Sequence, residues 1–262
     1  MKLRTPSTER DASRRVLNLT PGRAGWRYVG FEVVRLAQGE AIARETRDRE
    51  ACLVWLSGVC SLTVGSERWA RVGGRASPFD GPPAAAYIPP EERMRIRALD
   101  ASDVAIGWAP ATPGRAPRVY EDARVEQRGE GVMSRTIHQI LMEDREAERL
   151  LVTEVLTPAG HWSSYPPHKH DTDDPPNETY LEETYYFRFR DPRGFALQRV
   201  YTADRSVDES VAARDGDLVV VPRGYHTVSA APGYETYYLN VMAGPRREWK
   251  ITFDPDHERM RW

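Results

Sequence analysis

Glycine and proline interrupt this chain so often that long helices have little room. Among 262 residues there are 19 glycines and 20 prolines. Between them lie short runs rich in β-branched and aromatic residues, and helical periodicity is scarce. Candidate strands occur along the whole chain, at residues 26–36, 52–58, 59–65, 84–90, 94–99, 103–109, 150–157, 183–189, 195–202, 217–224 and 236–244. This spacing predicts an all-β sandwich or barrel, with one short helix expected within 138–151.

The two halves of the chain repeat one pattern. AAAYIPPEERMRIRA in the first half and DLVVVPRGYHTVSA in the second are each an apolar strand, a proline, a polar turn and another strand. Aligning Pro89 with Pro222 places Arg93 where the second half has His226. A repeat of about half the chain length indicates a duplicated barrel in which only the second copy kept its polar site.

The duplication defines the expected domains. We expect a degenerate N-terminal barrel without metal at residues 1–120 and a metal-carrying C-terminal barrel at 121–262. The polar segment 118–136 is the expected connection.

Charge and composition exclude several classes of partner. The formal net charge is −2 and the isoelectric point about 6.3, so nothing attracts nucleic acid or an anionic membrane. No apolar run approaches the ~18 residues that a membrane span needs, and no signal peptide is recognisable. Two cysteines, Cys52 and Cys60, do not make a disulfide framework. We therefore expect a cytoplasmic protein, and leave homo-oligomerisation open.

Two histidines one residue apart mark the candidate site. In the strand-like sequence HKH, His168 and His170 project to one face and Lys169 to the other. A third histidine, His226, follows an apolar strand and a glycine turn. Three neutral imidazoles and one carboxylate suit Zn, Mn, Fe or Ni. The pattern therefore predicts a site for one divalent transition metal, with Zn or Mn favoured.

Three glutamates compete to be the carboxylate ligand. Glu183 begins an aromatic strand and can lie beside the HKH strand, Glu182 is at the edge of the preceding loop, and Glu178 lies inside that loop. We predict Glu183, with Glu182 as the fallback. The polar loop Asp171–Asn177 either folds over the site or lies in solvent.

These motifs resemble those of known families. HKH followed by a glutamate, and GD…VPRGYH further on, resemble the two motifs of the cupin barrel, although the segment between His170 and Glu183 is longer than usual. More specifically, the chain resembles the 5-deoxy-glucuronate isomerase family from about Leu19 to Trp249, in LTPGRAGWRYVGFEVVRL, RTIHQIL, WSSYPPHKHD, TYLEETYY, FALQRVYT, DGDLVVVPRGYH and YYLNVMAGPRREW. The resemblance implies a tandem cupin, a double β-barrel or jelly roll whose N-terminal copy is degenerate. A related family, the uronate isomerases of pectin breakdown, supports Glu183 as the ligand.

The resemblance also implies a reaction. These enzymes of myo-inositol catabolism convert the open-chain aldehyde 5-deoxy-glucuronate to the ketose 2-deoxy-5-keto-gluconate. A divalent ion that chelates the carbonyl and the neighbouring hydroxyl would stabilise an enediolate while a base moves a proton. A metal-assisted hydride shift is the competing route.

Other site residues follow from strand alternation and from the resemblance. If Glu183 faces inward, so does Tyr185, our catalytic candidate. The substrate carboxylate requires a cation, for which Arg199 and then Arg205 are the choices. Tyr237, Asn240 and His138 lie in segments that match the family and are candidates for substrate binding. Tyr237 and Asn240 have opposite parity, so both cannot face inward without a bulge.

Two other functions are compatible with the same ligands. An iron-loaded cupin dioxygenase would consume oxygen, whereas an isomerase would not. A sugar-acid-binding cupin would bind its ligand without turnover.

Overall fold

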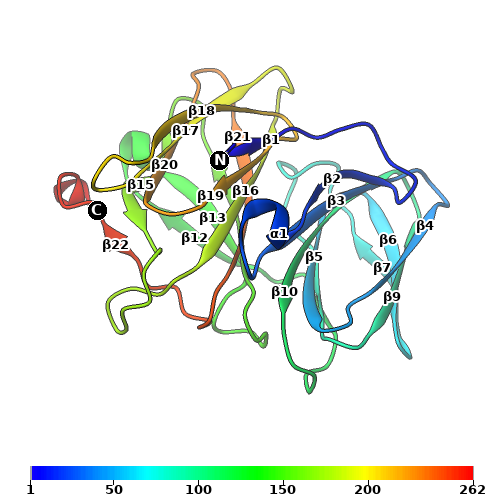
Figure 1. Cartoon of the computed structure of the whole chain (residues 1–262). Helices are drawn as coiled ribbons and strands as arrows, with labels where there is room; N and C mark the ends of the chain where they lie inside the picture. The colour runs from blue at the N-terminus through cyan, green and yellow to red at the C-terminus, as the bar shows by residue number, and fades with distance from the viewer. Residues whose placement is uncertain (1, 262) are drawn as a thin grey trace. The chain divides into compact units, whose positions relative to one another are not determined.

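Strands dominate the fold, as the sequence predicts (Figure 1). The computed structural model describes residues 2–261. The one α-helix of the described residues is the single turn α1 (Pro21–Ala24), and two 3-10 turns are η1 (Gly131–Met133) and η2 (Glu258–Met260). No helix in the described part of the chain has the length and apolar character needed to cross a membrane.

The chain divides into two compact units. The C-terminal unit comprises the residues up to Pro6, Val125–Ile137 and the chain from Thr153 onward, and the N-terminal unit comprises Ser7–Arg124 and His138–Val152. The main division therefore falls at 124/125, close to the expected boundary at 120. Unlike the expected domains, each unit also includes a short segment from the other half of the chain.

The C-terminal unit is built on two sheets. The larger sheet has the order β1 (Arg4–Thr5), β19 (Leu218–Val221), β16 (Glu182–Phe189), β21 (Thr236–Ala243), β14 (Leu151–Thr157), β13 (Arg135–Leu141) and β12 (Arg124–Arg128), with β13 and β14 divided between the units. The smaller sheet has the order β18 (Asp208–Arg214), β17 (Phe195–Tyr201), β20 (Tyr225–Ala230), β15 (Trp162–Lys169) and β22 (Thr252–Phe253).

The N-terminal unit repeats this arrangement with an apolar interior. Its larger sheet has the order β11 (Arg118–Tyr120), β8 (Ala85–Ile88), β5 (Arg49–Ser57), β10 (Ser102–Pro110), β3 (Gly30–Leu36) and β2 (Arg15–Leu19). The smaller sheet has the order β4 (Ala41–Glu45), β9 (Arg93–Ala98), β6 (Val59–Val64) and β7 (Glu67–Gly73). Buried side chains of both sheets, among them Trp55, Ile96 and Ile106, form one hydrophobic cluster.

Two local expectations are corrected. The short helix expected within 138–151 is wrong: residues up to Leu141 belong to strand β13, and the rest form turns and loop before β14. The segment 118–136 is more than a connection, because it contains β11, β12 and η1. Pairing within the sheets decided both segments: β13 lies between β12 and β14, and β11 pairs with β8. The local sequence does not report such pairing.

The structural repeat shifts the expected alignment by one residue. β9 and β20 correspond, since each lies between two strands of the smaller sheet. Arg93 is the first residue of β9 and is exposed, whereas Met94 is fully buried. His226 is likewise the buried second residue of β20. Met94 is therefore the counterpart of His226, because the turn before β9 is one residue longer than the turn before β20.

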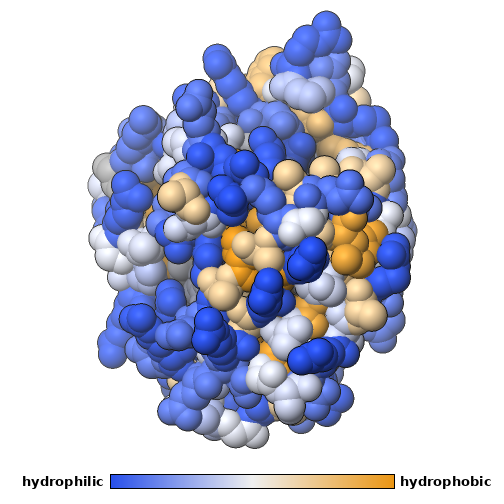
Figure 2. Space-filling view, turned by 90° about the vertical axis from the view of Figure 1, so that its right-hand side faces the viewer, coloured by the Kyte–Doolittle hydropathy of each residue, from blue (hydrophilic) through white to orange (hydrophobic). Residues whose placement is uncertain are grey.

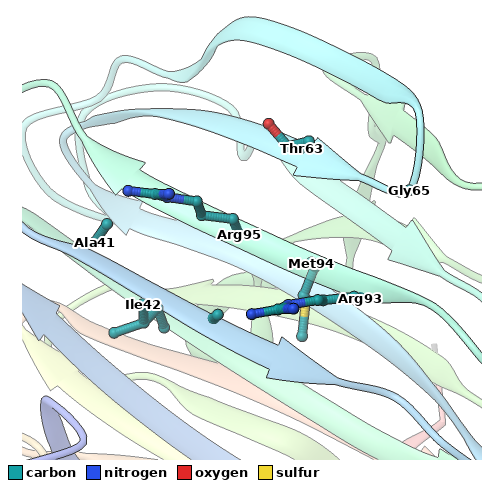
Figure 3. Close-up of a pocket in the computed structure, with 8 residues that line it drawn as sticks. Ala41, Ile42, Thr63, Gly65, Arg93, Met94 and Arg95 are labelled. Carbon is teal, nitrogen blue, oxygen red and sulfur yellow. The ribbon is translucent and has the colours of Figure 1, made fainter.

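The outer face of β9 is polar. Arg93 and Arg95 border a surface depression of about 540 Å³ that is also lined by Ala41, Ala43 and Thr63 (Figure 3). Figure 2, which faces the side of Figure 1 where β4, β6, β7 and β9 are drawn, shows mostly hydrophilic residues around a smaller hydrophobic area. The exterior of this sheet is therefore charged where its interior is apolar.

A buried carboxylate holds the loop that precedes β14. Glu50 in β5 is fully buried. Its Oε1 accepts hydrogen bonds from the backbone N–H groups of Arg149 and Leu150 at 2.7 and 2.8 Å. Its Oε2 accepts from the Glu148 backbone at 2.8 Å and from the Tyr87 hydroxyl at 3.0 Å. The side chain of Glu50 thus satisfies N–H groups that a helix would have paired with carbonyls.

We predict that Glu50→Gln lowers the free energy of unfolding by about 2–4 kcal/mol, because an amide NH₂ group would face backbone donors in a buried site. Tyr87→Phe is the matched control and should cost about 1 kcal/mol, since it removes a single hydrogen bond. Urea titration measures both. Equal and small losses would contradict the anchoring role of Glu50.

Candidate metal centre

Three histidines meet inside the C-terminal unit. His168 is near the end of β15, His170 follows that strand directly, and His226 is in β20. The register of the two strands pairs His168 with His226. All three side chains are buried, and one ring nitrogen of each lies within 4.8 Å of those of the other two. The structure therefore brings the three predicted histidines together.

Each histidine ring is oriented by the backbone carbonyl of a different residue. The Nδ1 atoms of His168, His170 and His226 lie 3.3, 2.9 and 3.3 Å from the carbonyl oxygens of Pro166, Leu181 and Gly224. A carbonyl only accepts, so each Nδ1 carries the proton in a neutral ring. Each Nε2 then presents a lone pair, as in a histidine that ligates a metal.

Glu183 is the carboxylate beside these rings. Its Oε2 lies 3.0 Å from His170 Nε2 and 3.1 Å from His226 Nε2, the latter without hydrogen-bond geometry. Its Oε1 accepts a hydrogen bond of 2.9 Å from the Asn240 amide. Glu182 precedes it on β16 and by alternation faces the other way.

Glu178 has a different function. It accepts hydrogen bonds from Lys169 Nζ and from the backbone N–H groups of Asp171 and Thr172, at 2.8–2.9 Å. Asp171 in turn accepts from the Gly224 backbone at 2.7 Å, two residues before His226. These contacts fix the base of the Asp171–Asn177 loop against the turn that carries His226.

Burial and the neighbouring charges shift the pKa values of these groups, and for His170 and Glu183 the two effects act in opposite directions. Burial and the imidazoles of His226 and His170 hold the pKa of His168 well below its ordinary value. Burial alone would lower the pKa of His170, but the Glu183 carboxylate outweighs it and raises that pKa. Burial would likewise raise the pKa of Glu183, but contacts with the His170 and His226 rings hold it well below the ordinary range. A buried carboxylate thus faces imidazole lone pairs, an arrangement that is unfavourable unless a cation lies among them.

Two tyrosines and two serines line the interior next to the rings. The Tyr185 ring lies 5.8 Å from that of His226, and its hydroxyl is 3.0 Å from Ser164 Oγ. The Tyr238 hydroxyl bonds to Ser163 and lies 3.3 Å from Ser164 Oγ. Burial, followed by the charge of Glu183, raises the pKa of Tyr185 well above its ordinary value, so its hydroxyl stays protonated at neutral pH and can donate a hydrogen bond.

Sequence reasoning missed a buried arginine at this interior. Arg135, at the start of β13, donates to the backbone oxygens of Met133 and Tyr165 at 2.8 and 3.3 Å. Burial lowers its pKa to about 10, and Tyr238 is the largest opposing influence. Arg135 begins RTIHQIL, one of the segments that resemble the family, but in a chain with so many arginines this segment does not single it out.

The structure does not bring the other predicted substrate residues to the rings. Arg199 lies on the outer face of β17, paired with Asp208 at 2.8 and 2.9 Å, and Arg205 stacks on the outer side of the Tyr201 ring at 4.4 Å. Both arginines are partly exposed, contrary to our expectation. Tyr237 points away from Asn240, as its parity requires, and donates to Glu154 at 2.9 Å.

His138 is buried in the part of β13 that belongs to the N-terminal unit, whereas the three rings belong to the other unit.

The donor set suits a metal ion. Three imidazole nitrogens and one carboxylate oxygen are the usual ligands of zinc and manganese in such sites. The unpartnered Nε2 of His226 is buried, which is the expected state of a ligand atom whose partner is an ion. The N-terminal unit lacks two of these donors. Met94 occupies the position of His226. Ala51 occupies the position of Glu183, because Ala51 pairs with the last residue of β8 as Glu183 pairs with the last residue of β19.

Comparison with solved structures defines the class of protein. An oxalate decarboxylase from Bacillus subtilis superposes with a TM-score of 0.67 over 96% of this chain and 79% of its own, at 12% identity, which shows the fold alone. An IolB-like protein from Salmonella typhimurium LT2 superposes with a TM-score of 0.96 at 42% identity, covering 99% of both chains. Fold and site together define an all-β cupin with a histidine centre.

The particular family follows from the sequence comparisons. The model of the KduI/IolB family matches residues 2–260, and the chain belongs to this family. Curated relatives named 5-deoxy-glucuronate isomerase include those of Geobacillus kaustophilus, 48% identical over 98% of this chain and 94% of the relative, and of Bacillus subtilis strain 168, 41% identical over 93% and 91%. The chain is therefore an enzyme of the isomerase class.

We predict that His168→Ala abolishes metal binding while the chain stays folded, because a buried imidazole is exchanged for a small apolar group. Metal per chain is measured by mass spectrometry after loading with Zn or Mn, and folding by circular dichroism. His257→Ala, which changes a histidine outside the three-ring cluster, is the control and should bind normally. A full complement of metal in the His168 variant would refute the assignment.

A second prediction concerns Asn240. Asn240→Leu should weaken metal affinity by about 10–100-fold, since the Glu183 carboxylate loses the donor that orients it. Titration with a competing chelator gives the affinity. Unchanged affinity would mean that Asn240 has no part in positioning Glu183.

Proposed function

We propose that this enzyme is a metal-dependent aldose–ketose isomerase that converts 5-deoxy-glucuronate to 2-deoxy-5-keto-gluconate in myo-inositol catabolism. The proposal is supported by relatives of that name at 41–50% identity over nearly the whole chain. A small sugar acid is then the substrate, and the cytoplasm the expected location. Homo-oligomerisation stays open.

The proposed metal dependence is supported mainly by the close approach of imidazole nitrogens to the Glu183 carboxylate. Two imidazole Nε2 atoms lie 3.0 and 3.1 Å from one carboxylate oxygen in a buried site. A proton on His170 would relieve one of these contacts, in keeping with its raised pKa. Protonating all three rings would place like charges side by side, which the lowered pKa of His168 opposes. A divalent cation among His168, His170, His226 and Glu183 resolves both conflicts, and Zn or Mn fits these donors.

A bound ion would supply Lewis acidity toward a carbonyl oxygen and its neighbouring hydroxyl. The protein's own residues have the remaining tasks. Tyr185, held by Ser164 and kept protonated, donates a hydrogen bond to a substrate oxygen near Glu183. Burial of the rings excludes water from the carbon whose proton moves. Proton transfer through a base and a hydride shift both remain open.

The substrate carboxylate requires a cation. Arg199 and Arg205 are turned outward, so we assign this task to Arg135. It is buried beside Tyr238, and its fork suits a carboxylate.

The function is tested by preparing the metal-free protein with a chelator and restoring Zn or Mn separately. We expect no conversion of 5-deoxy-glucuronate without metal, recovery with at least one of the two ions, and the same rate with and without oxygen. Turnover by the metal-free protein would contradict the metal dependence. Stoichiometric oxygen consumption would instead identify a dioxygenase, and binding without conversion a sugar-acid-binding cupin.

A further inference from the structure

One buried amide in the C-terminal unit has no partner. Gln198, in β17, is fully buried, and neither its Nε2 nor its Oε1 makes a hydrogen bond within the described residues. A buried amide without partners is costly to the fold, and leucine or methionine would fill the same space without that cost. The side chain therefore indicates a ligand for which a donor and an acceptor are needed together.

Gln198 points into the interior that holds the three rings. Its neighbours Leu197 and Arg199 lie on the exposed face of β17, so Gln198 and Val200 face inward by alternation. Val200 is directly opposite His226 in the next strand. Gln198 is therefore one inward position, about 7 Å along the strand, from the level of the candidate metal centre.

The same level of the interior is polar on its other side. In β20, Val228 lies between Gln198 of β17 and Ser163 of β15. Ser163 bonds to Tyr238 of the opposite sheet, and Tyr238 is beside Arg135. Hydroxyl, amide and guanidinium groups thus lie in the interior next to the rings, a lining that suits a polyhydroxylated acid and not an apolar compound.

We propose that the Gln198 amide binds a hydroxyl group of the sugar acid, several carbons from the carbonyl that is placed at the metal centre. The inference rests on the proposed function for the site. A hydroxyl both donates and accepts, so it can satisfy Nε2 and Oε1 through its own atoms and those of its neighbour on the carbon chain. A six-carbon open-chain acid is long enough to reach from the rings to Gln198. Gln198 thereby selects for substrates that are hydroxylated at this distance.

The test is Gln198→Leu in the metal-loaded enzyme. We expect KM for 5-deoxy-glucuronate to rise roughly ten- to hundred-fold, the value of one or two lost hydrogen bonds. The turnover number should change much less, because the contact is present in ground state and transition state alike. Metal content should be unchanged, and the unfolding midpoint unchanged or higher. Leu197→Gln, on the exposed face of the same strand, should leave KM within two-fold of wild type.

A Gln198→Leu enzyme with wild-type KM and full metal would overturn the inference and leave Gln198 a structural residue. Gln198→Met is measured in the same way if the leucine variant does not fold. If the wild type does not isomerise 5-deoxy-glucuronate, the proposed function fails by itself. Gln198 is then judged by calorimetric binding of D-gluconate, an open-chain polyhydroxy acid, which should be at least ten-fold weaker in the variant. Equal affinities, or no binding to wild type, would overturn the inference there too.

Discussion

The organisation of the site depends on three hydrogen bonds between imidazole Nδ1 atoms and backbone carbonyls. Because the carbonyl oxygens of Pro166, Leu181 and Gly224 can only accept, they set the tautomers of His168, His170 and His226. The opposite nitrogens are then committed to face one another and the Glu183 carboxylate. Such a cluster of buried polar groups is unfavourable without a cation, and a cation bound among them would stabilise it.

Two features of the backbone bring the cluster together. The pairing of β15 with β20 places His168 opposite His226, and β16 presents Glu183 from the facing sheet. The long segment between His170 and Glu183 is fixed at its base by Glu178 and Lys169, so its length does not loosen the ligands. The N-terminal unit has the corresponding strands with Met94 and Ala51 at the matching places, so apolar side chains fill these two positions there.

Features that depend on short-range sequence pattern were predicted, and most features that depend on contacts between distant residues were not. Short spacing and strand alternation predicted most of the strands and the meeting of the three histidines. Glu183 was preferred over Glu182 because it begins the aromatic strand and because of the family resemblance, and the structure places it beside two of the rings. Arg199 was wrongly expected inside because nothing local reports which face of β17 is turned to the interior. Arg135, Glu50 and Gln198 were missed for a related reason. Their significance lies in burial and in partners far along the chain, and an arginine, glutamate or glutamine in a strand carries no signal of either.

The proposed centre holds one ion between residues of two facing sheets. The most direct measurement is a crystal structure of the zinc- or manganese-loaded protein with anomalous diffraction at the edge of that metal. We expect a single peak about 2.0–2.3 Å from the Nε2 atoms of His168, His170 and His226 and from a Glu183 oxygen. A loaded protein whose peak lies elsewhere, with these imidazoles bonded only to each other and to Glu183, would contradict it.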